Sequence, residues 1–323
     1  MSLAQSDTPR TRWTPAEIFS RFGLWIIFAL LMIVTSRLSD SFLTFSNLSN
    51  VARQISINAL LAFGMTAVIL TGGIDLSVGA LVALAGVSSV MLDKLGLPFP
   101  VTFLGTLLIG GLVGSFNGLI AAYGRIAPFI VTLAAMTILR GVTLTLTNGS
   151  PLTGLSDPFT ALANTDFLGL SVPVWVTLLA LVATWFLLRR TAWGRGVYAL
   201  GSSESATSFA GLPVNRLKVT VYAFSGLMAG LAALLLTSRL NSAQPTAGEG
   251  FELDAIAAVV VGGTRLAGGR GGVIGTLLGA LIIGVLNNAM NLLNVNPFFQ
   301  MIVKGVVILG ALLLERVLNG RRS

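Results

Sequence analysis

Long apolar segments with almost no charge constrain this chain more than any other feature. A helix needs about 20 apolar residues to span the hydrocarbon core of a bilayer. Ten segments meet or approach that length: 22–36, 55–73, 76–92, 99–122, 126–147, 172–188, 219–238, 253–263, 273–293 and 298–314. Only 10% of the 323 residues are charged, which is too few for a water-facing surface. We therefore predict an all-α polytopic membrane protein with about ten transmembrane helices.

Two of these ten segments are short. Residues 22–36 are flanked by Arg21 and Arg37, whose long side chains can reach the membrane interfaces. Residues 253–263 are too few to span a bilayer alone, and Asp254 lies at their start. We expect this eighth segment to be a broken or half-depth helix, which is tolerated only where its backbone is buried in protein.

The distribution of arginine and lysine predicts the orientation of the chain, because cytoplasmic loops carry an excess of both. With the N-terminus inside, fourteen of the 20 basic residues fall in inside segments, four fall outside and two fall within helices. This alternation requires an even number of spans. We predict cytoplasmic tails at 1–21 and 315–323, joined by a single transmembrane domain at 22–314 with a basic inside loop at 189–218.

An internal repeat predicts how the helices are related. The string Gly105-Thr106-Leu107-Leu108 recurs as Gly275-Thr276-Leu277-Leu278, and at the same offset Asn117 matches Asn287. The matched segments are the fourth and the ninth, so they cross the membrane in opposite directions. This pattern is typical of inverted-topology repeats in transporters, in which the substrate path lies at the interface between the two halves.

Several functional classes lack the residues they need. The chain has no cysteine and no histidine, which removes thiol catalysis, thiolate metal sites and the commonest proton relay. It has no P-loop, and we interpret the glycine-rich residues 262–272 as a tight cytoplasmic turn between two helices. We therefore expect no cofactor in this chain. The net charge of +8 comes without dense basic and aromatic patches, so we expect no nucleic-acid partner.

Polar residues within the apolar segments are candidates for the transport path. Asp75 and Ser77 follow two glycines, and they are either a helix cap in a short cytoplasmic turn or a buried polar element. Asp75 or Asp254 can form an ion pair with Arg140 or Lys304, or each of these charged side chains lies near a helix end and snorkels to the interface. The asparagines suit sugar hydroxyls but also serve as interhelical hydrogen-bonding groups. The candidates are Asp75, Ser77, Asn117, Arg140, Asp254, Asn287, Asn288 and Lys304.

The inside loop contains a segment, residues 201–211, with the pattern of a short surface helix. It has a serine cap, an acidic first turn, a compact face of small residues with one aromatic ring, and a glycine stop. The residues that provide these features are Gly201, Ser202, Ser203, Glu204, Ala206, Phe209 and Gly211. Such a helix either docks in a groove of a cytoplasmic partner or lies on the membrane surface without one.

Several longer strings carry a resemblance to a known family. They are residues 64–66, 71–79, 140–143, 147–151, 198–201, 242–248, 252–260 and 300–304. From about Asn47 onward, the chain resembles the ribose-type permease subunits of bacterial ABC sugar importers, and ribose is the substrate that this resemblance implies first. Gly72 departs from the ribose pattern, where a serine stands, and this leaves the substrate open within the family.

The resemblance implies an ABC importer permease architecture in the bacterial inner membrane and a set of partners. A second permease chain, expected to be an identical copy, completes the pore within the membrane lipid. A periplasmic sugar-binding protein docks outside, and a cytoplasmic ATPase subunit binds ATP and Mg²⁺. Residues 201–211 fall at the family's coupling helix. The alternatives are an ion-driven secondary transporter, which needs a titratable relay, and an intramembrane enzyme, which needs paired acids, a dyad or a metal cluster.

Overall fold

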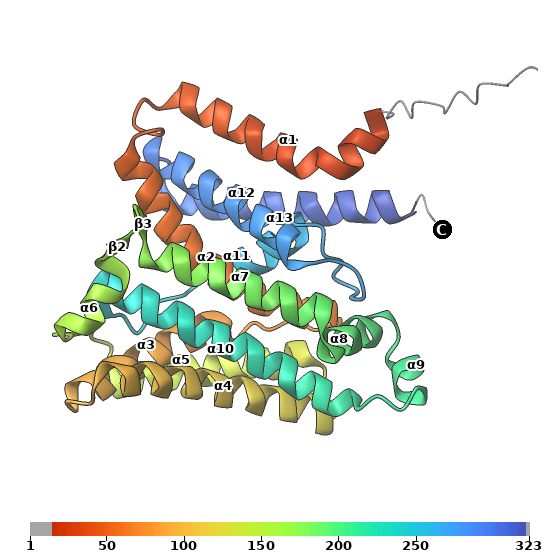
Figure 1. Ribbon diagram of the computed structural model, residues 1–323, viewed down its shortest axis with the longest axis horizontal. Helices are drawn as coiled ribbons and strands as arrows, with labels where there is room; N and C mark the ends of the chain where they lie inside the picture. The colour runs from red at the N-terminus through yellow and green to blue at the C-terminus, as the bar shows by residue number, and fades with distance from the viewer. Residues whose placement is uncertain (1–14, 321–323) are drawn as a thin grey trace, which may run out of the picture.

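The computed structural model describes residues 15–320, and it is almost entirely helical within that range (Figure 1). The helices are α1 (Pro15–Leu38), α2 (Phe45–Leu70), α3 (Val78–Lys94), α4 (Phe99–Tyr123), α5 (Pro128–Thr147), α6 (Asp157–Asn164), α7 (Val172–Arg190), α8 (Ala192–Ser202), α9 (Glu204–Phe209), α10 (Val214–Leu240), α11 (Phe251–Val261), α12 (Val273–Leu292) and α13 (Pro297–Gly320). Four two-residue strands, β1 (Leu152–Thr153), β2 (Asp166–Phe167), β3 (Leu170–Ser171) and β4 (Ser242–Ala243), form two antiparallel pairs.

Six helices in the described part are long and apolar enough to cross a membrane: α2, α4, α5, α7, α10 and α12. Shorter apolar stretches lie in α1 and α13. The prediction of an all-helical chain is thus confirmed, and each of the ten predicted segments overlaps a helix. The short eighth segment is α11, which has 11 residues and at 1.5 Å per residue covers only about half of a bilayer core.

Several predicted boundaries differ from the structure. Helix α2 begins at Phe45, well before residue 55, because the Oγ1 of Thr44 caps it by accepting a hydrogen bond from the backbone N–H of Asn47 at 3.3 Å. Helix α1 begins at Pro15, inside the predicted tail 1–21, and α13 continues into the predicted tail 315–323. Residues 1–14 and 321–323 of those tails lie outside the described residues.

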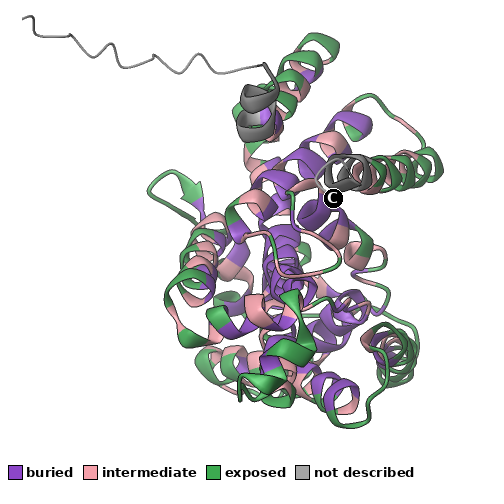
Figure 2. Ribbon diagram, turned by 90° about the vertical axis from the view of Figure 1, so that its right-hand side faces the viewer, coloured by how far each residue is buried: buried purple, intermediate pink, exposed green. Residues whose placement is uncertain are grey.

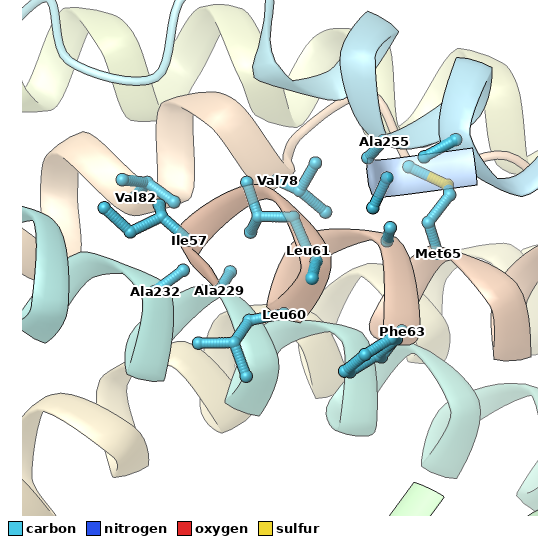
Figure 3. Packing of buried hydrophobic residues seen from close by; sticks show 14 of the residues in the cluster. Ile57, Leu60, Leu61, Phe63, Met65, Val78, Val82, Ala229, Ala232 and Ala255 are labelled. Atoms are coloured by element: carbon cyan, nitrogen blue, oxygen red, sulfur yellow. The ribbon is translucent and has the colours of Figure 1, made fainter. Parts of the chain in front are cut away.

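Helix α2 lies at the centre of the bundle. Every residue from 55 to 70 is buried, so neighbouring helices surround this part of α2 on all sides. Figure 3 shows Ile57 and Leu60 of α2 beside Ala229 and Ala232 of α10. These small side chains let α10 approach closely, as small residues do between membrane helices.

Helices α4 and α10 are in close backbone contact along glycines. A Cβ atom added to Gly114 of α4 would lie 2.1 Å from the carbonyl oxygen of Tyr222 on α10. A Cβ on Gly226 of α10 would lie 2.1 Å from the carbonyl oxygen of Gly110. Dispersion contacts between backbones take the place of the hydrophobic effect, which does not drive helices together in lipid.

The connecting segments gather at two ends of the bundle, which we call the α9 end and the α6 end (Figure 1). At the α9 end, the backbone N–H of Gly269 donates to the carbonyl of Leu70 at 2.9 Å. The hydroxyl of Tyr198 on α8 donates to the carbonyl of Gly271 at 3.0 Å. The glycine-rich residues 262–272 therefore form a turn between α11 and α12, as predicted, and this turn is bonded to α2 and α8.

Specific polar contacts also join the segments at the α6 end. Leu152 of β1 pairs with Ala243 of β4. The carboxylate of Asp93, near the end of α3, accepts hydrogen bonds from the N–H and Oγ of Ser156 at 2.8 and 2.6 Å. The side chain of Asn164 on α6 donates to the carbonyl of Ser238 on α10 at 3.2 Å. These contacts fix α6 across the ends of α3 and α10.

Candidate functional site

Asp75 lies in a non-helical linker, residues 71–77, between α2 and α3. Gly72 has a φ of 77°, a conformation that favours glycine, and it turns the chain away from the axis of α2. The side chain of Asp75 is buried, at 1% exposure. Its Oδ1 accepts hydrogen bonds from the backbone N–H of Ser77 at 3.0 Å and from the Ser77 hydroxyl at 2.6 Å.

Two further helices bond to this linker. The hydroxyl of Ser225 on α10 donates to Oδ2 of Asp75 at 3.0 Å. The Nδ2 of Asn117 on α4 donates to the Ser77 hydroxyl at 2.9 Å. We call Asp75, Ser77, Asn117 and Ser225 the Asp75 cluster. Asp75 bonds directly to Ser225 on α10 and is linked to α4 through Ser77, so it is a buried polar element that joins helices and not only a helix cap.

Asp254 forms a second buried cluster, on α11. Its side chain has 5% exposure, and its Oδ2 accepts a hydrogen bond from the Nζ of Lys304 on α13 at 3.0 Å. The side chain of Asn287 on α12 also bonds to Asp254, while its own Oδ1 is buried without a partner. The ion pair of an aspartate with an intramembrane cation, one of the two alternatives from the sequence, is confirmed here. We call these three residues the Asp254 cluster.

Arg140 on α5 bonds to backbone carbonyls. Its Nη1 donates to the carbonyl of Pro245 at 2.7 Å and to that of Ala247 at 3.0 Å. Both acceptors lie in the segment between β4 and α11. Arg140 therefore ties α5 to the segment that leads from β4 into α11.

Asn288 forms an interhelical amide pair. The Nδ2 of Asn288 donates to the Oδ1 of Asn47 at 2.9 Å, and the Nδ2 of Asn47 donates to the Oδ1 of Asn288 at 3.0 Å. The pair joins α12 to the first turn of α2. For Asn288 the structure favours interhelical bonding over sugar recognition, because both the nitrogen and the oxygen of its side-chain amide are bonded to Asn47.

The predicted coupling segment 201–211 is two helices and not one. Ser203 caps α9 and accepts a hydrogen bond from the N–H of Ala206 at 3.2 Å. Glu204 pairs with Lys218 of α10 at 2.7 Å. Phe209 is 93% exposed at the end of α9. Gly211 follows with a φ of 76° and ends the segment, as predicted.

Gly201 and Ser202 belong to α8, which corrects their assignment to the surface helix. A Cβ on Gly201 would lie 1.8 Å from the carbonyl oxygen of Leu70, so Gly201 is packed against the end of α2. The hydroxyl of Ser202 donates to the carbonyl of Tyr198 within α8 at 2.9 Å. The sequence pattern failed here because the small residues that suggested a docking face instead permit close backbone packing.

Three residues in or beside the Asp75 cluster have no recognisable signal in the sequence. The hydroxyls of Thr132 on α5 and Tyr222 on α10 lie 3.2 and 3.4 Å from the carbonyl oxygen of Ile74. Ser225 bonds to the aspartate itself. Hydroxyl residues do not recur at a regular spacing within apolar helices. Most of their hydroxyl groups bond to the backbone carbonyl one turn earlier in the same helix, so the sequence does not distinguish the few that bond to another segment.

Metal binding has no support in the part of the chain that the structure describes. No group of three or more Asp, Glu, His or Cys side chains lies close enough there to hold an ion. The buried polar groups instead bond to one another across helices. The arrangement suits a protein that holds polar linkers and helix ends in defined positions within a membrane.

Comparisons with known proteins agree with this arrangement. A family described as the permease component of branched-chain amino acid transport systems matches residues 47–312. The chain is 48% identical to the ribose import permease protein RbsC of Bacillus subtilis (strain 168), over 98% of this chain and 99% of that protein. It is 47% identical to RbsC of Escherichia coli (strain K12), over 96% of this chain and 98% of that protein.

A more distant relative has a different named substrate. The chain is 36% identical to the D-allose transport system permease protein AlsC of Escherichia coli (strain K12), over 94% of each chain. No solved structure was found to match.

Proposed function

Since this chain belongs to the family of permease components of branched-chain amino acid transport systems, we propose that it is the membrane-spanning pore subunit of an ATP-driven importer for ribose or a related monosaccharide. The observation that carries the proposal is the 48% identity, over nearly the whole of both chains, to a protein named as a ribose import permease. The lower identity to the allose protein, 36%, favours ribose among the sugars.

In this proposal the chain crosses a bacterial inner membrane ten times, with both termini and the α9 end in the cytoplasm. The grouping of loops supports this topology. The predicted inside segments 189–218 and 262–272 meet at the α9 end. Arg53, which was predicted outside, pairs with Asp166 at the α6 end. The excess of basic residues at the α9 end then follows the positive-inside rule.

The two asparagines of the internal repeat support an inverted-repeat architecture. Asn117 and Asn287 occupy matching positions in α4 and α12, and each bonds to a cluster built on a buried aspartate. The Asp75 cluster follows α2, whose last residue is bonded to the α9 end. The Asp254 cluster follows the segment 244–250, which enters the bundle from β4 at the α6 end. The two segments thus enter the bundle from opposite ends, as an inversion between the halves requires.

The α9 end is the side on which we place the ATPase subunit. Phe209 projects from α9 with 93% exposure. Beside it, Tyr123 of α4, Glu204 of α9 and Arg216 of α10 line an open groove of about 360 Å³. An exposed aromatic ring next to a polar groove suits a docking site for a partner. ATP and Mg²⁺ are bound by that partner in this proposal, and closure of the ATPase is transmitted through α9.

The α6 end is then the outer mouth, where a periplasmic sugar-binding protein delivers its ligand. A second copy of this chain completes the pore. Arg140, Asp254, Asn287 and Lys304 lie in the outer half of the path, and the Asp75 cluster lies in the inner half. Because the Asp75 carboxylate is enclosed by protein donors, we assign it to holding the linker in place and not to binding sugar.

The experiment that tests this function uses the chain reconstituted in lipid with its ATPase partner. Binding proteins loaded with ribose, allose or arabinose are added in turn, and ATP hydrolysis and uptake of labelled sugar are measured. The expected result is stimulation of both activities, greatest with the ribose-loaded protein.

Each other outcome has a distinct meaning. If a binding protein loaded with another sugar stimulated ATP hydrolysis and uptake while the ribose-loaded protein did not, the proposed substrate would be wrong but the ATP-driven import mechanism would stand. Uptake without ATP hydrolysis, abolished by an uncoupler, would overturn the mechanism in favour of ion coupling. Cross-linking between introduced cysteines tests the second copy directly, because the chain has no cysteine of its own.

A further inference from the structure

The pair of strands β2 and β3 forms a tight hairpin at the α6 end. Asp166 pairs with Ser171 and Phe167 with Leu170, which leaves a two-residue turn of Leu168 and Gly169. Both have positive φ, 51° and 78°. Hairpin turns with two positive φ values favour asparagine, aspartate or glycine. A leucine in this conformation is strained, so a gain elsewhere must offset the cost of the strain.

The tip of the hairpin is apolar and exposed. Phe167 is 61% exposed, Leu168 78% and Leu170 42%. Figure 2, viewed along the helix axes, shows this exposed strand pair projecting sideways from the bundle. A segment that projects sideways from the bundle lies in the plane of the membrane and faces lipid. A soluble partner in the periplasm would instead approach along the helix axes.

Two contacts hold the hairpin rigidly to membrane helices. The Nε1 of Trp175 on α7 donates to the carbonyl of Phe167 at 2.9 Å, and the two rings meet edge to face with centroids 6.3 Å apart. The Nη2 of Arg53 on α2 lies 3.1 Å from the Oδ1 of Asp166. The exposed tip is therefore presented in a fixed position and is not a loose loop.

The apolar tip continues a membrane-facing surface. Helix α7 follows the hairpin directly and is one of the six candidate spans. Its exposed side chains include Leu178, Leu179, Val182 and Phe186. Trp175, in the first turn of α7, has the aromatic and hydrogen-bonding character of residues that gather at membrane interfaces.

From this continuity we propose that the hairpin, residues 166–171, is an anchor that inserts Phe167, Leu168 and Leu170 into the interface of the lipid leaflet at the α6 end. Contact of Leu168 with acyl chains offsets the strain of its backbone. Through Arg53 and Trp175, the anchor fixes the ends of α2 and α7 at one depth in the membrane. The proposal concerns lipid contact and is independent of the transported substrate.

The chain has no cysteine, so a single introduced cysteine can be labelled without removing any others. Leu168→Cys and, as a matched control, Asp157→Cys in the exposed first turn of α6 are each spin-labelled. The full-length protein is placed in nanodiscs of phosphatidylethanolamine and phosphatidylglycerol. Collision rates with oxygen, which partitions into lipid, and with a water-soluble nickel chelate are then measured. We expect oxygen to dominate at position 168 and the nickel chelate to dominate at position 157.

Equal access of the nickel chelate to both positions would overturn the proposal. Protection of position 168 from both reagents, with spin–spin broadening, would replace lipid by a second copy of the chain. Protection that arises only when a sugar-binding protein is added would replace lipid by that protein.

A second variant separates the lipid contact from the stability of the turn. Leu168→Asn creates the Asn-Gly pair that this turn favours. We expect its unfolding temperature in detergent to be unchanged or higher, while the unfolding temperature in nanodiscs falls relative to wild type. A rise of equal size in both media would show that lipid contributes nothing at this position.

Discussion

The Nζ of Lys304 lies 3.0 Å from the Oδ2 of Asp254, and this ion pair joins α13 to α11. The aspartate is almost fully buried, whereas the lysine side chain retains 31% exposure. Helix α11 is too short to span the membrane alone, so its position depends on its neighbours. The pair is therefore a specific link between a short internal helix and the last helix of the chain.

Removing the lysine leaves the carboxylate buried without its cation. We expect Lys304→Met to destabilise the protein by about 3 kcal/mol, the lower part of the range for breaking a buried ion pair. The double variant Lys304→Met/Asp254→Leu removes both charges and should recover most of this loss. Thermal unfolding of the purified variants measures both effects. A double variant as unstable as the single one would contradict the assignment of the loss to an unpaired charge.

The Asp75 cluster predicts a graded series. Ser225→Ala removes one of three donors to the carboxylate and should cost about 1 to 2 kcal/mol, as for a hydrogen bond to a charged group. Asp75→Leu leaves the donors of Ser77 and Ser225 without their acceptor and should cost more. Unfolding temperatures test the order. If Asp75→Leu were as stable as wild type, the cluster would have no role in holding the linker 71–77.

The exposed ring of Phe209 allows docking to be tested without disturbing the fold. Because the ring is almost fully exposed, Phe209→Ala should leave the unfolding temperature unchanged. We expect sugar-stimulated ATP hydrolysis to fall by about tenfold or more, as when one dominant contact residue of an interface is removed. The exposed leucine Leu240, at the other end of α10, provides the matched control Leu240→Ala. Unimpaired stimulation in the Phe209 variant would remove this ring from the proposed ATPase contact.

The charge on α9 gives an independent test of coupling. Glu204→Arg breaks an exposed ion pair with Lys218, which is worth less than about 1 kcal/mol, so the protein should fold. Gly211→Pro cannot adopt the φ of 76° and should distort the end of α9 locally. We expect both variants to reach the membrane and to lose transport. Normal sugar uptake in both would count against a coupling role for this segment.

Alanine substitutions at two helical glycines distinguish the effect of close helix packing from the effect of helix propensity. Gly114→Ala places a Cβ against the carbonyl oxygen of Tyr222 and forces α4 from α10, which should cost about 1 to 3 kcal/mol, as overpacking does. A Cβ at Gly141 meets nothing within 4 Å, so Gly141→Ala should be neutral or slightly stabilising. Equal unfolding temperatures for the two variants would contradict the contact.

The sequence predicted the helical segments well because hydropathy over about 20 residues directly reflects the membrane environment. It also predicted the short eighth segment, which α11 confirms. An ion pair of Asp75 or Asp254 with an intramembrane cation was one of two alternatives that the sequence left open, and the structure shows it for Asp254. The start of α2 was misplaced because Asn47 and Arg53 are polar, although both lie within the helix at the α6 end. Polar residues near a membrane surface mask a helix that continues beyond the apolar segment.

The candidate site was less predictable because its contacts join residues far apart in the chain. Asp75 could be selected as an intramembrane charge, but its partner Ser225 lies on a different helix 150 positions away. Likewise, Gly201 was taken for part of a surface helix, since no sequence pattern distinguishes a glycine in a docking face from one packed against a carbonyl. Such contacts depend on how helices pack, which a single sequence does not encode locally.

The packing of Gly201 against the carbonyl of Leu70 has a mechanical consequence. The space between them is too small for even one methyl group, so α8 and the end of α2 can be neither compressed nor slid past each other without breaking the contact. We therefore expect α8 to carry a push on α9 to the last turn of α2, and from there to the linker that holds Asp75. The exposed α9 is thus connected to the buried centre of the bundle through rigid backbone contacts. The rigidity of this connection depends on glycine at position 201, because any side chain there would separate α8 from α2.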